Sequence, residues 1–296
     1  MTLPNFLIIG VQKAGTTSVY NYLNEHPQIY MSPVKETNFF ETDWEKESAE
    51  SLKKSRQTIR DIDTYSKLFD GVEDEIAIGE ASPNYLLHHQ VSTETIQRYI
   101  PEAKLIAILR NPAERAYSDY LMHIRDAIEK PEPLSEIIAH RSHSAYFFRK
   151  GFYYEPIKHF FDKFGKEKVK VYLYDDLCKD PQALMQNMYN FLGVDDSFVP
   201  NTGKKAQKAK VPKNQGVNNL LKTKNPLRTI AASTLKVFLP LEVRQKLREG
   251  IINLNSQGKD ALPLQAEDRA KMVKMFREDV LNLQDLLQKD LSPWLS

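Results

Sequence analysis

The chain has 296 residues, of which 41% are hydrophobic and 27% are charged, so it can bury the core of one large domain. Its 41 Lys and Arg residues nearly balance 39 Asp and Glu residues, which excludes the strongly basic surface that general nucleic-acid binding requires. The single cysteine excludes an intrachain disulfide framework, and no apolar run approaches the ~18 residues of a membrane span, so we expect a cytoplasmic protein without stable membrane insertion.

Three short apolar runs predict strands of a parallel sheet. They are Asn5–Gly10, Ile76–Gly79 and Lys104–Leu109, and the two longer runs lack strict alternation. This is typical of strands that are covered by helices on both faces. The first run is followed by a helical pattern over Thr16–His26, and the third by one over Pro112–Ile128. This repetition predicts an α/β fold with a central, mostly parallel sheet flanked by helices.

The start of the second of these helices is well marked. Asn111 is a preferred N-cap residue, Pro112 takes the first helical position and Glu114 the capping-box position. One face of the helix is apolar and is expected to pack on the sheet. That face comprises Ala116, Tyr117, Tyr120, Leu121 and Ile124.

The remainder of the chain predicts one edge strand and several helices. Residues Glu167–Tyr174 alternate in polarity and indicate a strand nearer an edge. The helical periods fall at Pro156–Phe164, Pro181–Leu192 and Glu267–Leu287. Residues 201–213 hold five lysines and predict a mobile basic loop, after which residues 217–296 are expected to form a helical cover. We therefore expect one domain over residues 1–296.

The loop after the first predicted strand, Gly10–Ser18, has the features of an anion-binding turn. It joins a strand to a helix N-terminus, where backbone N–H groups converge and the helix dipole adds partial positive charge. Hydroxyls at Thr16, Thr17 and Ser18 add donors. The sequence thus predicts phosphate binding, with a plain strand–helix turn as the alternative.

The spacing within this loop argues against ATP or GTP. A Walker A loop places a lysine directly after its second glycine, where it reaches the β and γ phosphates. Here Thr16 takes that position, and the loop lysine, Lys13, lies closer to the strand. This favours a shorter phosphate group, with a cation beside the bridging oxygen of a leaving group.

Several segments resemble the sulfotransferases that use 3′-phosphoadenylyl sulfate (PAPS). Residues 7–27 (LIIGVQKAGTTSVYNYLNEHP) resemble their 5′-phosphosulfate loop, and residues 109–126 (LRNPAERAYSDYLMHIRD) their 3′-phosphate-binding strand and helix. Residues 35–40 (KETNFF) are similar to the KExxFF segment of heparan sulfate and related bacterial sulfotransferases, whose glutamate is the catalytic base. The resemblance continues through GEASPNYL, RKGFYYEPIKHFFDKFG, YDDLCKDPQALMQNMYNFLGV and a closing DLSPW.

The resemblance implies a P-loop-like fold and sulfuryl transfer from PAPS to an acceptor hydroxyl, with an amine as the less favoured acceptor. The product would be adenosine 3′,5′-bisphosphate (PAP), and no metal is expected. Lys13 would stabilise the leaving oxygen, while the 5′-phosphate would be held by Ala14, Gly15, Thr16, Thr17 and Ser18.

Glu36 is the candidate base by this resemblance. A carboxylate partly enclosed by Phe39, Phe40 and the substrate could accept a proton near neutrality, and Lys35 would tune it. The alternative is an acid that merely precedes a short helix. His123 is a rival base or a hydrogen-bond partner of the substrate, and a packed histidine is equally compatible with its position.

Arg110 closes a predicted strand, where a charge at the carboxyl edge of a parallel sheet is usually directed at a ligand. Its fork geometry suits the 3′-phosphate, to which Ser118 would add a hydroxyl. By resemblance, Tyr153 and the preceding Arg149 and Lys150 lie beside the nucleotide. The basic loop would close over it through Lys204, Lys205 or Lys213.

The acceptor and the alternatives stay open. Heparan sulfate enzymes usually have a lysine where this chain has Ala81, which favours a smaller or neutral acceptor among small molecules, lipids and carbohydrates. A P-loop-like nucleotide phosphotransferase and a non-catalytic nucleotide-binding protein are the alternative functions. A metal site at His88 and His89, or at residues 140–143, has poor ligand spacing. The acidic run Glu41–Glu50 is interpreted as a solvated face.

Overall fold

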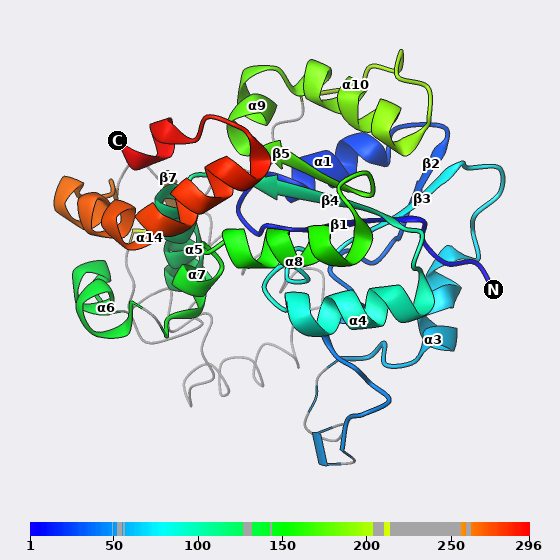
Figure 1. Ribbon diagram of the computed structural model, residues 1–296, viewed down its shortest axis with the longest axis horizontal. Helices are drawn as coiled ribbons and strands as arrows, with labels where there is room; N and C mark the ends of the chain where they lie inside the picture. The colour runs from blue at the N-terminus through cyan, green and yellow to red at the C-terminus, as the bar shows by residue number, and fades with distance from the viewer. Residues whose placement is uncertain are drawn as a thin grey trace, which may run out of the picture. The chain divides into compact units, whose positions relative to one another are not determined.

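A five-stranded parallel sheet forms the centre of the computed structural model (Figure 1). The strand order is β2-β3-β1-β4-β5, and every neighbouring pair is parallel. In chain order the strands are β1 (Phe6–Gly10), β2 (Ile29–Met31), β3 (Ala77–Ala81), β4 (Lys104–Leu109) and β5 (Val169–Leu173). The predicted α/β class is confirmed, and so is the edge position of the alternating strand β5.

The structure describes residues 1–48, 50–51, 55, 57–126, 132–142, 144–203, 210–213, 256–258 and 262–296. Their contacts divide the chain into two compact units. The first unit comprises Met1–Arg115, Phe148–Ala206 and Val273–Ser296, and it holds the whole sheet. The second comprises Ala116–Phe147 and Gln207–Met272. The expectation of a single domain stays a prediction.

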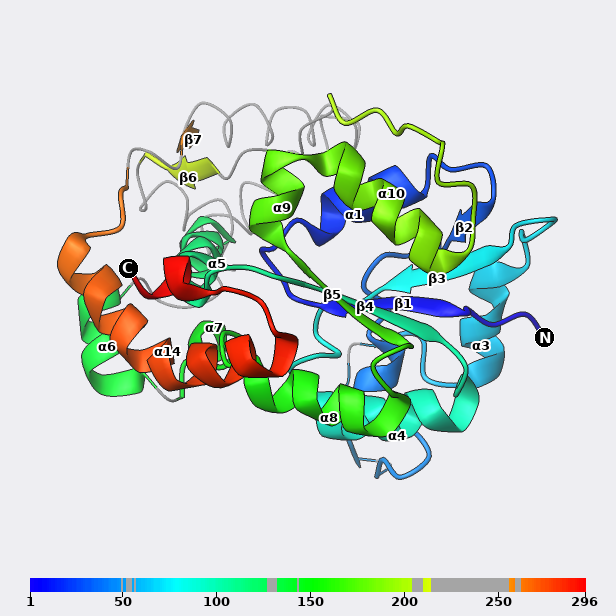
Figure 2. The ribbon, with the colours of Figure 1, turned by 45° about the horizontal axis from the view of Figure 1, so that its top comes forward.

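Helices cover both faces of the sheet in the first unit (Figure 2). On one face lie α1 (Thr16–Leu23), α9 (Tyr174–Lys179) and α10 (Pro181–Leu192). On the other lie α3 (Ile62–Ser66), α4 (His89–Tyr99) and α8 (Tyr154–Phe164). Because both faces are covered, all five residues of β1 are buried, as are the five residues of β4 that follow Lys104.

Short turns of 3-10 helix complete this unit, at η1 (Phe39–Glu41), η2 (Lys67–Phe69) and η4 (Ser292–Leu295). Neither β2 nor α4 was predicted from the sequence. The first has only three residues, and the second buries Ser92, Thr93 and Thr95 beside Ile96, so that neither shows a clear apolar period.

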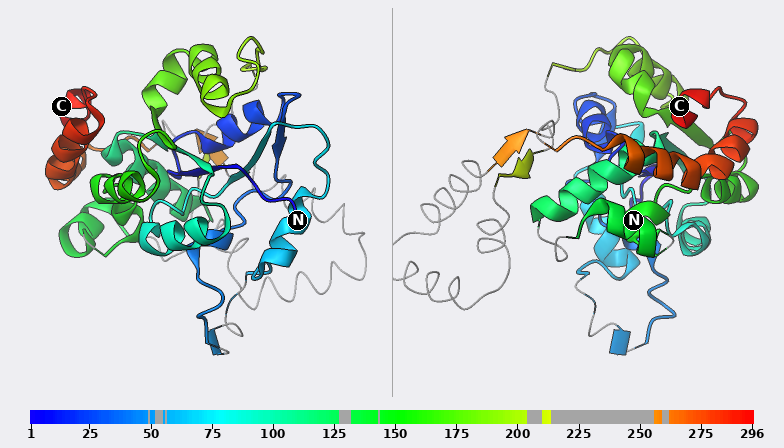
Figure 3. Two further views of the ribbon diagram at one scale, coloured as in Figure 1. Left: turned by 45° about the vertical axis from the view of Figure 1, so that its right-hand side comes forward. Right: turned by 90° about the vertical axis from the view of Figure 1, so that its left-hand side faces the viewer.

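Helix α5 (Pro112–Asp126) begins in the first unit and continues in the second. Its predicted cap is confirmed, because Asn111 Oδ1 accepts hydrogen bonds from the backbone N–H groups of Ala113 and Glu114. The second unit also contains α6 (Leu134–Arg141) and the antiparallel pair β6 (Lys210–Pro212) and β7 (Ser256–Gly258) (Figure 3). Part of the basic loop, including Lys204 and Lys205, and more than half of the predicted helical cover lie outside the described residues.

The last long helix, α14 (Ala266–Leu287), begins one residue before its predicted start. Its predicted apolar stripe is buried at Met272, Phe276, Val280 and Leu283, whereas Leu287 is half-buried. A short helix, α7 (Tyr146–Arg149), precedes the segment that leads into α8. Among the helices in the described part of the chain, none is both long and apolar enough to cross a membrane.

Candidate functional site

The loop between β1 and α1 presents a helix N-terminus at the carboxyl edge of the sheet. Gly15 is the N-cap of α1, with φ of 84°, and a Cβ there would come within 2.6 Å of Leu177 Cδ2. Only glycine fits this position without strain. Because the cap has no side chain and the first turn of α1 holds no acidic residue, the first amides of the helix are left for an external anion.

Arg110 approaches this loop from the neighbouring strand β4. Its guanidinium donates to the backbone carbonyl of Lys13 at 3.0 Å and lies 4.7 Å from the centre of the Tyr174 ring. The hydroxyl of Tyr153 donates to the carbonyl of Arg110 at 2.9 Å. Burial raises the pKa of Tyr153 well above its ordinary value, so this hydroxyl remains a donor. The structure therefore brings together Lys13, Arg110 and Tyr153, three residues that the sequence analysis selected.

Glu36 lies in the connection after β2, at the same edge. Its N–H donates to the carbonyl of Ala81 at 2.9 Å, and its backbone is left-handed, with φ of 62°. The carboxylate is 39% exposed and pairs with Lys35 Nζ at 2.6 Å. The expectation that Phe39, Phe40 and the substrate partly enclose it stays a prediction. Both rings are buried among the aromatic side chains of the core, stacking on or packing against Tyr65, Tyr85 and Tyr99.

Glu41, which sequence reasoning assigned to a solvated face, is a half-buried acid beside the site. Burial raises the pKa of its carboxyl to about 7, and this is partly opposed by the positive charge of Lys150 and a hydrogen bond from Asn84. The negative charge of Glu36 raises it further. No local pattern could have revealed this, because the burial comes from segments distant in sequence.

Lys150, in the segment before α8, contacts the loop between β1 and α1. It is only 8% exposed, and its ammonium donates to Gln12 Oε1. A small pocket lies beside this contact. Its lining is mostly apolar and comprises Val11, Gln12, Pro83, Leu86, Leu87, Arg149, Lys150, Phe152 and Pro156. The basic residues Arg149 and Lys150 therefore lie beside the loop between β1 and α1.

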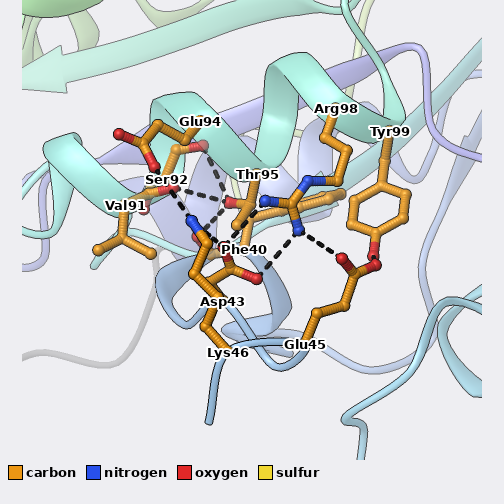
Figure 4. A network of polar contacts seen from close by, with 10 residues as sticks. All are labelled: Phe40, Asp43, Glu45, Lys46, Val91, Ser92, Glu94, Thr95, Arg98 and Tyr99. Atoms are coloured by element: carbon orange, nitrogen blue, oxygen red, sulfur yellow. Dashed lines mark hydrogen bonds and ion pairs between the residues drawn. The ribbon is translucent and has the colours of Figure 1, made fainter.

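The segment that follows Glu41 is fixed to α4 by a polar network (Figure 4). Arg98 makes a bidentate pair with Asp43, at 2.9 and 3.0 Å, and Tyr99 donates to Glu45 at 2.7 Å. The hydroxyl of Thr95 donates to the carbonyl of Phe40 at 2.8 Å. Hydrogen bonding to Arg98 holds the pKa of Asp43 well below its usual range, so the pair stays charged and anchors this turn.

Two further predicted residues, Ser118 and His123, lie on the part of α5 that belongs to the second unit. Ser118 is buried, and His123 Nε2 lies 3.8 Å from Asp119 Oδ1. The His123 ring also packs edge-on against Phe147. These contacts suit a packed histidine, and the assigned roles of both residues stay predictions. In the described part of the chain, no group of three or more His, Cys, Asp and Glu side chains could hold a metal ion.

A family model described as "Sulfotransferase family" matches residues 4–198, a range that contains the loop, Glu36 and Arg110. The chain is 32% identical to mouse carbohydrate sulfotransferase 15 over 40% of this chain and 27% of that protein. It is 29% identical to human bifunctional heparan sulfate N-deacetylase/N-sulfotransferase 3 over 65% of this chain and 22% of that protein. It therefore spans only about a quarter of these relatives' length.

A solved structure of a sulfotransferase from Alicyclobacillus acidocaldarius is similar over the whole of both chains. The two share 29% sequence identity with a TM-score of 0.71, and the alignment covers 100% of each. The similarity thus extends beyond the residues that the family model matches.

Proposed function

Because this chain belongs to the sulfotransferase family, we propose that it moves a sulfuryl group from PAPS to an acceptor hydroxyl, with an amine as the less favoured acceptor. One observation carries the proposal. A glycine-capped helix N-terminus, a loop lysine and an arginine from the next strand meet at the carboxyl edge of a parallel sheet. That arrangement suits a nucleotide with two separate phosphate groups.

The 5′-phosphate would lie on the first turn of α1. There the backbone amides and the hydroxyls of Thr16, Thr17 and Ser18 can donate to it, and the amides of Ala14 and Gly15 precede them in the loop. Arg110 would hold the 3′-phosphate, since its fork can bind two phosphate oxygens while its position is kept by the carbonyl of Lys13. Ser118, Lys204 and Lys205 are proposed as further 3′-phosphate ligands, and Tyr153 as a support of Arg110.

In the proposed reaction the acceptor oxygen attacks sulfur in line with the bond to the phosphate. The acceptor proton passes to Glu36, the bond between sulfur and the bridging oxygen breaks, and PAP leaves with the negative charge on that oxygen. Lys13 stabilises this charge. Glu36 is exposed and ion-paired with Lys35, so in this proposal the arriving acceptor displaces water from the carboxylate and Lys35 adjusts its basicity.

The acceptor is proposed to be small or neutral. Ala81, where heparan sulfate enzymes usually have a lysine, is fully buried, and its carbonyl accepts from the backbone of Glu36. A highly anionic glycan would therefore lack one cation beside the base. The proposal requires neither a metal nor a tightly bound cofactor, and localisation in the cytoplasm remains part of it.

Nucleotide binding provides the first test. A ligand that binds only the folded state raises the melting temperature, so PAP should stabilise the protein and ATP with Mg²⁺ should not. Stabilisation by ATP with Mg²⁺ alone would instead support a phosphotransferase. Incubation with PAPS and a panel of a phenol, a sterol and a neutral sugar, followed by mass spectrometry, should then show a sulfated product. Binding of PAP with no transfer to any acceptor, in the panel or in cell extract, would favour the non-catalytic alternative.

A further inference from the structure

A second carboxylate, Glu80, lies entirely inside the protein beneath the candidate base. It is the fourth residue of β3 and has no exposed surface. Its Oε1 accepts from the hydroxyl of Ser82, and its Oε2 accepts from the hydroxyl of Tyr85 at 2.8 Å and from that of Tyr65 at 3.5 Å. Burial raises the pKa of this carboxyl to about 7. Burying a carboxyl group costs free energy, so its presence here and the hydroxyls that bond to it need a physical explanation.

Two of these hydroxyls, those of Ser82 and Tyr85, also accept hydrogen bonds from the backbone of the segment that bears Glu36. Ser82 Oγ accepts from the N–H of Asn38 at 2.9 Å, and the Tyr85 hydroxyl accepts from the N–H of Phe40 at 3.4 Å. The Tyr85 hydroxyl also lies 3.3 Å from Thr37 Oγ1. Each hydroxyl therefore bridges the buried carboxylate and the loop above it.

The carboxylate determines the direction of these bridges. A hydroxyl has one proton to donate, and above its pKa of about 7 the Glu80 carboxylate is ionised and can only accept. Because Ser82 and Tyr85 donate to Glu80, their lone pairs point away and are available to the N–H groups of Asn38 and Phe40. Hydrogen bonds linked in this way also strengthen one another in a buried environment.

The supported segment is one that would not keep its shape alone. Glu36 and Asn38 both have left-handed backbones, with φ of 62° and 52°, a conformation that residues other than glycine rarely adopt. The segment that bears Ser82 and Tyr85 is fixed to the sheet, because the N–H groups of Ser82 and Leu86 donate to carbonyls of the central strand β1 at 3.1 and 2.8 Å. The hydroxyls of Ser82 and Tyr85 thus hold the loop in a fixed position relative to the sheet.

We propose that Glu80 is a positioning residue, which through the hydroxyls of Ser82 and Tyr85 holds segment 36–40, with its two left-handed residues, and so directs the Glu36 carboxylate toward the acceptor. This inference rests on the proposed role of Glu36 as base. It explains why a carboxylate occupies the interior, because a neutral side chain would not orient both hydroxyls in the same way.

The protein offers a matched pair of variants, Tyr85→Phe and Tyr65→Phe. Both tyrosines are fully buried, and both hydroxyls contact Glu80 Oε2. Each substitution keeps the ring and removes one oxygen. Of the two tyrosines, Tyr85 is the one whose hydroxyl is bonded to the loop backbone, whereas Tyr65 meets Phe39 through ring stacking that phenylalanine preserves. Loss of packing or of a Glu80 contact is therefore common to both, and loss of loop support is specific to Tyr85→Phe.

Hydrogen exchange tests the geometry without an acceptor. In mass spectrometry of the full chain, the peptide over residues 35–44 should exchange faster in Tyr85→Phe and in Ser82→Ala than in the unmodified protein, and at an unchanged rate in Tyr65→Phe. Glu80→Gln should behave like Tyr85→Phe, because its amide donates to one of the hydroxyls and reverses it. Equal exchange of this peptide in the Tyr85 and Tyr65 variants would overturn the proposal.

Kinetics test whether the loop acts through Glu36. With the acceptor of the panel that is sulfated fastest, Tyr85→Phe should lower kcat about tenfold with little change in the KM for PAPS, because small misplacement of a reacting group is costly. Tyr65→Phe should stay within about twofold of the unmodified protein. In a Glu36→Gln background, Tyr85→Phe should have almost no further effect, since coupled residues are not additive.

The outcomes separate the two proposals. If Glu36→Gln itself keeps normal turnover, the assignment of the base fails. If Glu36→Gln lowers kcat but Tyr85→Phe lowers it equally in both backgrounds, the base stands and the positioning role of Glu80 is overturned. The increase in melting temperature caused by PAP should be the same in all variants, because none of these side chains belongs to the nucleotide loop.

Discussion

Lys13 takes part in the site through both its backbone and its side chain. Its carbonyl accepts the hydrogen bond that positions Arg110, and its ammonium is proposed to meet the leaving oxygen. Its backbone is already left-handed, with φ of 73°, so replacing it with alanine introduces no new conformational demand. The carbonyl contact to Arg110 would remain in such a variant. The two functions of this residue can therefore be separated by experiment.

At the residue scale, Lys13→Ala and Arg110→Ala should have different kinetic consequences. Lys13→Ala removes a charge that is needed most in the transition state, and we expect kcat to fall about a hundredfold or more. Arg110→Ala removes a phosphate ligand, so the dissociation constant of PAP should increase more than kcat decreases. Calorimetric titration of PAP and steady-state rates measure the two quantities. A Lys13→Ala protein that binds PAP far more weakly but keeps its kcat would contradict the assignment.

The elements that sequence could predict are those whose pattern is local. The unbroken apolar runs identified β1 and β4, and the Asn111 cap identified the start of α5. The proximity of Lys13 and Arg110 was predictable because each follows the end of a neighbouring parallel strand, whereas their roles stay predictions. The raised pKa values of Glu41 and Glu80 were not predictable, because their surroundings come from segments distant in sequence, such as those that bear Lys150 and Asn84 for Glu41 and Tyr65 for Glu80.

At the scale of elements, α8 begins on a carboxylate supplied by a distant helix. The side chain of Asp279, on α14, accepts from the N–H groups of Tyr153 at 2.8 Å and Tyr154 at 3.2 Å. This satisfies amides at the start of the helix and holds the chain beside Arg110. Burial raises the pKa of Asp279 to about 6, from an ordinary value of 3.8.

The raised pKa predicts a specific dependence of stability on pH. Between about pH 4 and pH 6 the folded state keeps the Asp279 proton while the unfolded state releases it, so this group lowers the free energy of unfolding as pH rises and has no further effect above its folded pKa. Asp279→Asn should lack this contribution. Relative to the unmodified protein, its free energy of unfolding should therefore rise with pH across this window, by about 1–3 kcal/mol. Urea denaturation at several pH values measures the difference, and a constant difference would refute the prediction.

At the scale of the whole molecule, the last residues of the chain are tied into the first unit beside the site. Trp294 is 4% exposed, its indole donates to Asp175 Oδ2 at 3.1 Å, and its carbonyl accepts from Asn111, the cap of α5, at 3.4 Å. Its ring also packs edge-on against Tyr153. Helix α9, the start of α5 and the start of α8 are thus connected through one residue near the C-terminus.

Removing this side chain should weaken the unit as a whole. Trp294→Ala leaves a large cavity, and substitutions of this kind cost about 3–5 kcal/mol of unfolding free energy. Leu281→Ala, at a 40% exposed position of α14, is the matched control and should change stability by less than about 0.5 kcal/mol. Because Tyr153 donates to the carbonyl of Arg110, PAP binding should weaken in Trp294→Ala and not in Leu281→Ala. Thermal melts with and without PAP measure both effects, and equal losses in the two variants would show that the C-terminal segment contributes nothing specific.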